Sequence, residues 1–135
     1  MSQQFNDYKE VLKKNNNLCD KNVTLIEDEH YNVNHAMVGY FLTKSWNISP
    51  TITQVILMHH AIDPLFLNGK ENEARNRMMA ILKLSTHLSH NFHRLADDLE
   101  WEHIAPAVLA YLGLNYDDYE DLRVETGTLL DGVAA

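Results

Sequence analysis

Apolar residues recur every three or four positions along almost the whole chain, and this period constrains the fold more than any other feature. Such spacing places apolar side chains on one face of a helix, whereas a half-buried strand needs sustained alternation of apolar and polar residues. No segment of the sequence shows that alternation. The sequence therefore predicts an all-α fold, a compact bundle of about six to seven helices.

Cap residues and helix breakers divide this pattern into segments. An asparagine at Asn32 or Asn34 can cap one helix, which stops near Asn47, and Ser49-Pro50 is a typical opening for the next. Gly113 is a typical residue for the end of a helix. We expect helices over residues 8–14, 23–30, from the asparagine cap to 47, from 50 to the break at Asp63-Pro64, and over 73–93, 104–112 and 115–130.

A chain of 135 residues with 45% hydrophobic residues is long enough to form one domain with its own core, which we expect to span residues 1–135. The single cysteine, Cys19, excludes an internal disulfide and fits a reducing compartment. The first ten residues are polar, unlike a signal peptide, and no apolar run has the length of a membrane span. These features predict a cytoplasmic protein that does not enter a membrane.

Charge argues against one class of partner. The chain has 19 acidic and 11 basic residues, a formal net charge of −8. Affinity for a phosphate backbone comes largely from clustered lysines and arginines, and the basic pairs at 13–14 and 75/77 are too short to form a groove. We expect no nucleic-acid partner.

Two helices carry apolar stripes next to histidines. Helical geometry places residues three or four apart on one face. The stripes that we expect to be buried are His35 with Val38, Gly39 and Leu42 on one helix, and Ile52, Val55 and Ile56 on the next. Gly39 removes a side chain from its face, so another helix or a ligand can come close there.

Three histidines are the candidate site of this sequence. His59 continues the stripe of the second helix and His60 lies one step round. A short linker favours antiparallel packing of the two helices, which would bring His35 to the same end as the histidine pair. The three imidazoles would then converge, either as hydrogen-bonded structural residues or as metal ligands. Asp63 is the nearest candidate carboxylate.

A second run of histidines occurs at His87, His90 and His93. The same helix also carries apolar residues, and we expect them to form its buried side: Met78, Ile81, Leu82, Leu88 and Phe92. His87 falls opposite that side, so the run predicts a solvated face rather than a binding site.

The segment "IEDEHYNVNHAMVGYFLTKSWNISPTITQVILMHH" resembles the HDOD family, the HD-related output domain of bacterial signalling proteins. The resemblance is strongest over residues 25–61 and looser over the rest of the chain, and it implies an HD-domain-like helical fold. The residues that carry it are Glu27 or Glu29, His35, Ala36, Val38, Gly39, Leu42, Trp46, Pro50, Ile56, His59 and His60.

The departures from related enzymes decide which function the resemblance implies. HD phosphohydrolases and HD-GYP phosphodiesterases have a His-Asp dyad on an earlier helix, and this chain has no His-Asp pair and no Gly-Tyr-Pro motif. We therefore expect the later part of an HDOD domain, either a fragment or a product that lost the front helices. The resemblance implies a non-catalytic module of signal transduction, with no catalytic residue.

The alternative is a metal-dependent phosphohydrolase or phosphodiesterase of the HD superfamily, whose site another chain or a missing segment completes. The candidate ligands under either reading are His35, His59, His60 and Asp63. We expect no cofactor and no bound metal, a divalent ion being the open alternative. The partners implied are other signalling domains or proteins, and a second copy of the chain in a homo-oligomer.

Overall fold

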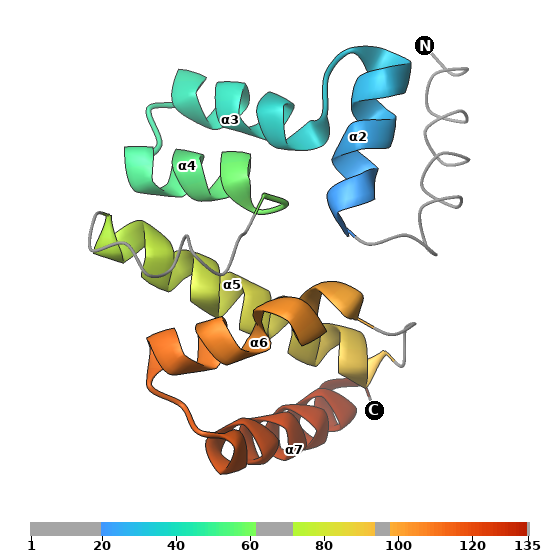
Figure 1. Ribbon diagram of the computed structural model, residues 1–135, viewed down its shortest axis with the longest axis vertical. Helices are drawn as coiled ribbons and strands as arrows, with labels where there is room; N and C mark the ends of the chain where they lie inside the picture. Colours follow the sequence, from blue (N-terminus) through green and yellow to red (C-terminus); the bar gives the residue numbers. More distant parts are fainter. Residues whose placement is uncertain (1–19, 62–71, 94–97, 135) are drawn as a thin grey trace. The chain divides into compact units, whose positions relative to one another are not determined.

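The computed structural model describes residues 20–61, 72–93 and 98–134, which contain six helices and no strand. This confirms the all-α prediction, while the helix predicted over residues 8–14 lies outside the described residues. The helices are α2 (Asp20–Tyr31), α3 (His35–Ser45), α4 (Pro50–Met58), α5 (Glu73–Phe92), α6 (Leu99–Leu112) and α7 (Tyr116–Ala134) (Figure 1).

The chain divides into two compact units, residues 1–62 and residues 63–135. The first unit contains α2, α3 and α4, and the second contains α5, α6 and α7. The single domain expected over residues 1–135 stays a prediction. None of the helices in the described residues is long and apolar enough to cross a membrane.

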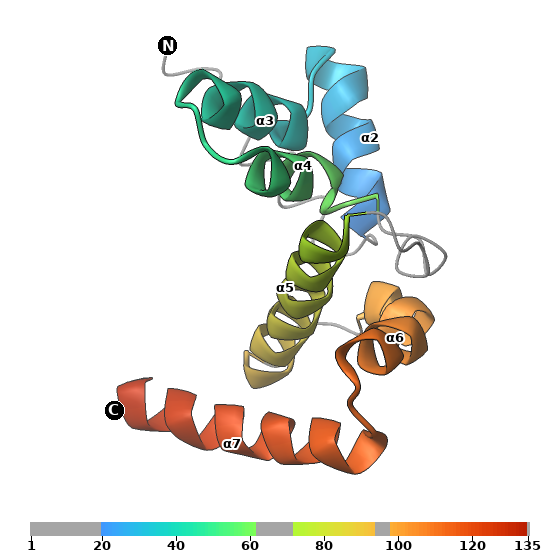
Figure 2. The ribbon, with the colours of Figure 1, turned by 90° about the vertical axis from the view of Figure 1, so that its left-hand side faces the viewer.

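In the first unit, α3 and α4 run antiparallel and side by side (Figures 1 and 2). Ala36 on α3 and Val55 on α4 are buried, and Thr53 is buried with its hydroxyl donating to the Pro50 carbonyl. At Gly39 the two helices come very close, because a Cβ there would lie 2.8 Å from Cγ2 of Ile56. The predicted close approach at Gly39 is thus confirmed, and its partner is a helix.

The predicted buried stripes of these two helices were only partly right. Val38 and Leu42 are 43% and 47% exposed, and Ile52 is 39% exposed. The side of α3 that faces α4 is the one with the small residues Ala36 and Gly39. Apolar residues of α3 lie on several sides of the helix, so periodicity alone could not show which side is buried. Close packing against α4 requires small side chains, which are Ala36 and Gly39 here.

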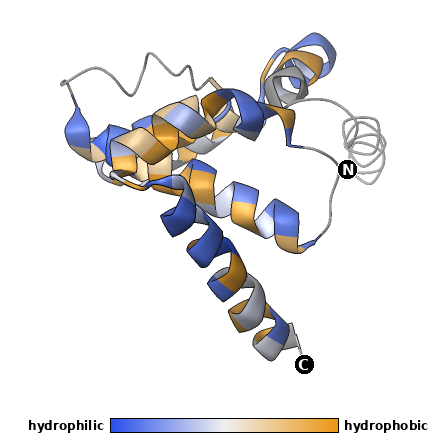
Figure 3. Cartoon of the chain, turned by 60° about the horizontal axis from the view of Figure 1, so that its bottom comes forward, coloured by the Kyte–Doolittle hydropathy of each residue, from blue (hydrophilic) through white to orange (hydrophobic). Residues whose placement is uncertain are grey.

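In the second unit, α5 packs against α6 and α7. Asp98 caps α6, its carboxylate accepting from the backbone N–H of Trp101 at 3.0 Å, so α6 begins earlier than the predicted residue 104. The helices carry both hydrophobic and hydrophilic residues (Figure 3). The described residues of this unit that are apolar and buried are Met79, Ala80, Leu84, Trp101, Ile104, Val108 and Tyr119.

The side of α5 predicted to be buried was wrong. Met78, Ile81 and Leu82 are exposed, and the buried side includes the polar residues Asn76, Lys83 and His87. Lys83 is only 6% exposed because its ammonium donates to both carboxylate oxygens of Glu100, at 2.9 and 2.8 Å. Pairing and hydrogen bonding allow charged groups to be buried, and a sequence pattern treats those groups as solvated.

Candidate functional site

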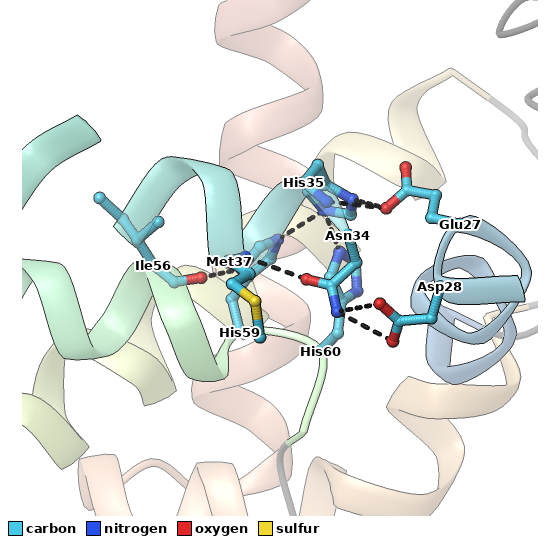
Figure 4. A network of polar contacts seen from close by, with 8 residues as sticks. All are labelled: Glu27, Asp28, Asn34, His35, Met37, Ile56, His59 and His60. Carbon is cyan, nitrogen blue, oxygen red and sulfur yellow. Dashed lines mark hydrogen bonds and ion pairs between the residues drawn. The ribbon is translucent and has the colours of Figure 1, made fainter. Parts of the chain in front are cut away.

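The turn between α2 and α3 fixes where α3 begins. Asn32 adopts a left-handed conformation with φ 54°, which asparagine tolerates better than most residues. Asn34 is the N-cap: its side-chain oxygen accepts from the Met37 N–H at 2.9 Å, and its amide donates to both carboxylate oxygens of Asp28 at 3.1 Å. These bonds make His35 the first residue of α3 (Figure 4).

A buried glutamate on α2 orients the His35 ring. Glu27 is 2% exposed, and its Oε2 accepts from the backbone N–H of His35 at 2.9 Å and lies 2.6 Å from Nδ1 of the same residue. A carboxylate oxygen at this position holds the hydrogen on Nδ1. Nε2 of His35 then presents its lone pair on the other side of the ring.

Two histidines at the end of α4 meet that nitrogen. Nε2 of His35 lies 3.3 Å from Nε2 of His59 and 2.7 Å from Nε2 of His60 (Figure 4). The ring of His59 is oriented by its other nitrogen, because Nδ1 donates to the Ile56 carbonyl at 2.6 Å. The antiparallel arrangement of α3 and α4 therefore brings the three predicted rings together, as the sequence indicated.

Of the other residues predicted for the site, one contacts it, one is exposed and one is not described. Of the two acidic candidates of the family pattern, Glu27 contacts the site and Glu29 is exposed. Asp63 lies outside the described residues. In the described part of the chain, His35, His59 and His60 are the group of side chains with suitable geometry for a metal ion, and each of them is half-buried. Their role as ligands stays a prediction.

Chemically, three converging imidazole nitrogens can bind a cation or share a proton. The carboxylate of Glu27 stands behind His35 rather than among these nitrogens, an arrangement common in metal sites, where a carboxylate orients a histidine ligand. Sequence reasoning identified Glu27 only as one of two alternatives. The sequence holds no signal that selects Glu27 over Glu29, because the burial of Glu27 is a property of the fold.

A second polar cluster, in the other unit, was missed. His87 is buried, stacks on Trp101 with ring centroids 4.4 Å apart, and lies 2.9 Å from both Asp98 Oδ2 and the Tyr119 hydroxyl. It joins α5, α6 and α7 and belongs to the core, not to a solvated face. Burial, followed by the neighbouring charge of Glu120, raises the pKa of Tyr119 above its ordinary value of 10.0.

The first unit is thus a helical domain whose three histidines meet at the junction of two antiparallel helices. Residues 1–62 match the family model of the HDOD domain. The matched segment coincides with the first compact unit. No curated protein and no solved structure matches the chain. The looser resemblance over the later residues stays a prediction.

Proposed function

We propose that this protein is a non-catalytic regulatory module of signal transduction that acts through contacts with other proteins in the bacterial cytoplasm. The observation that carries the proposal is the HDOD match over residues 1–62. Domains of a signalling family need not turn over a substrate, because a change in a contact surface is enough to transmit a state.

The composition of the site supports a non-catalytic role. Among the described residues, the group with metal-binding geometry consists of three histidines and contains no carboxylate. Of the described carboxylates, Glu27 contacts His35, and one of its oxygens lies within hydrogen-bond distance of both the backbone N–H and the ring of His35. Glu27 therefore serves to build the first turn of α3, and hydrolysis would require a further group to activate water.

An exposed apolar surface supports the contact mechanism. We call the residues Met37, Phe41, Leu42, Trp46 and Ile48, on α3 and directly after it, the α3 apolar surface; all are exposed. Phe41 is 60% and Trp46 68% exposed, and large aromatic side chains contribute strongly to protein interfaces. Clustered exposed apolar residues mark interaction sites. We propose that this surface is buried against a second copy of the chain.

Sedimentation velocity of the full chain over a range of concentrations tests that contact. The wild type is expected to self-associate, and a Phe41→Ser/Trp46→Ser double variant is expected to be monomeric. Val133→Ser is the matched control, because Val133 on α7 is 85% exposed and lies in the other unit. A monomeric wild type, or equal loss of association in the control, would contradict the role of this surface.

A metal-dependent phosphohydrolase is the second candidate, and the convergence of His35, His59 and His60 favours it. Another chain or segment would have to supply a carboxylate and a histidine. The full chain should be assayed against cyclic dinucleotides and simple phosphate esters with added Mn²⁺ or Zn²⁺. Turnover that is lost in His35→Ala would establish this candidate and refute the non-catalytic proposal.

A further inference from the structure

We propose that His35, His59 and His60 bind one divalent transition-metal ion through their Nε2 atoms, and that this ion stabilises the packing of α3 against α4. The inference goes beyond the regulatory function proposed above and does not depend on it. It rests on the spacing of the three nitrogens, on how two of the rings are oriented, and on the chemistry of the donors.

The spacing is close to what a metal ion needs. Two nitrogens bound to one zinc ion at tetrahedral angles lie about 3.3 to 3.4 Å apart, given Zn–N bonds of about 2.0 to 2.1 Å. Nε2 of His35 and Nε2 of His59 are 3.3 Å apart. Nε2 of His60 is 2.7 Å from Nε2 of His35, so this ring has to move outward by about 0.6 Å to complete the same geometry.

The orientation of two rings is set from behind. The Ile56 carbonyl can only accept a hydrogen bond, so Nδ1 of His59 carries the hydrogen and Nε2 presents a lone pair. The carboxylate of Glu27 has the same effect on His35. The two Nε2 atoms lie 3.3 Å apart, and one cation can accept a lone pair from each of them.

The donor set selects the class of metal. Three imidazole nitrogens without a carboxylate suit Zn²⁺, Co²⁺, Ni²⁺ or Cu²⁺, whereas Mg²⁺ and Ca²⁺ prefer oxygen ligands. His35 is the first residue of α3, and His59 and His60 directly follow α4. An ion bound to all three connects the two helices of a unit in which only Ala36 and Val55 are buried apolar residues among those described.

Cobalt titration of the full chain, purified without a histidine tag and stripped with a chelator, tests the site. We expect one Co²⁺ per chain, visible absorption bands of a four-coordinate ion, and a higher Tm with Co²⁺ or Zn²⁺ but not with Mg²⁺ at the same concentration. His59→Ala and His60→Ala should each weaken binding more than tenfold. His103→Ala, which removes an exposed histidine on α6, is the matched control.

Glu27→Gln gives a second readout that keeps all three ligands. Loss of the carboxylate behind His35 should weaken Co²⁺ binding by about 10- to 100-fold, with the helical circular dichroism retained. The proposal is overturned if the wild type binds no stoichiometric Co²⁺, if Mg²⁺ raises Tm equally, or if His103→Ala weakens binding as much as the site variants. The absence of metal binding would leave the proposed protein contacts unaffected.

Discussion

At the scale of single residues, Gly39 is decisive for the packing of α3 on α4. A Cβ at this position would lie 2.8 Å from Cγ2 of Ile56. Glycine has a low helix propensity, so its presence in the middle of α3 costs about 1 kcal/mol relative to alanine. Close approach of the two helices offsets that cost, and the same approach brings the three histidines together.

Gly39→Ala should therefore lower the free energy of unfolding by about 1 to 2 kcal/mol, because overpacking outweighs the gain in helix propensity. Urea denaturation measures the effect. Gly127→Ala on α7 is the matched control: nothing lies within 4 Å of a Cβ there, so this change should be neutral or stabilising. In an Ile56→Ala background, which removes the opposing methyl group, Gly39→Ala should lose most of its cost; an unchanged cost would refute the steric explanation.

Tyr119 is the second residue with a specific prediction. Its hydroxyl lies 2.9 Å from Nε2 of the buried His87. Tyr119→Phe should lower the free energy of unfolding by about 1 kcal/mol near neutral pH, because it removes this hydrogen bond. Tyr116→Phe is the control, since Tyr116 is 68% exposed and should tolerate the change.

The effect of Tyr119 should also depend on pH. Burial raises the pKa of Tyr119 above 10.0, so the unfolded chain releases this proton at a lower pH than the folded chain. The contribution of Tyr119 to stability is therefore fully present below about pH 10 and is lost as the pH rises toward the folded pKa. Urea denaturation at about pH 8 and about pH 11 should show a smaller difference between wild type and Tyr119→Phe at the higher pH. A constant difference would contradict this linkage.

At the scale of helices, the caps at the two ends of the α3–α4 pair differ in a way that can be tested. The Asn34 side chain makes a cap hydrogen bond to Met37 and also binds Asp28. Ser49, the N-cap of α4, makes no side-chain cap hydrogen bond, and Pro50 follows it. The start of α3 therefore depends on its cap residue, whereas the start of α4 relies on the fixed φ of proline.

We expect Asn34→Ala to lower Tm and the free energy of unfolding by about 1 kcal/mol, while Ser49→Ala changes them by less than about 0.5 kcal/mol. Thermal and urea denaturation followed by circular dichroism measure both. Because His35 directly follows Asn34, the asparagine variant should also weaken Co²⁺ binding, and the serine variant should not. Equal effects of the two substitutions would refute the assigned role of the Asn34 cap.

At the scale of the whole molecule, the described parts of the two units differ in the buried residues that they contain. Among the residues that the structure describes, seven buried apolar ones belong to the second unit and two, Ala36 and Val55, to the first. The second unit also contains the buried pair Lys83–Glu100 and the cluster around His87. A domain of this size with its own core can fold alone.

A polypeptide of residues 63–135 should therefore be helical by circular dichroism and unfold in a cooperative thermal transition. A polypeptide of residues 1–62 contains all three histidines, and added Zn²⁺ or Co²⁺ should raise its Tm if they bind metal. Failure of residues 63–135 to fold would show that the two units form one cooperative domain, as the sequence predicted.

The sequence by itself determined the all-α class, most helix positions, the convergence of His35, His59 and His60, and the resemblance of the first unit to the HDOD family. These properties depend on local periodicity, on cap residues and on a dense set of family residues, which act over short stretches of chain. Antiparallel packing across a short linker is also a local consequence.

Only the tertiary structure decided which helix faces are buried. On α3 and α5, apolar residues lie on more than one side, and contacts distant in sequence select among them: Ile56 against Gly39, Glu100 against Lys83, and Tyr119 against His87. A polar residue is buried only where a distant partner satisfies its hydrogen bonds, and periodicity carries no information about that partner. For the same reason, the contact between Glu27 and His35 could not be predicted from the sequence.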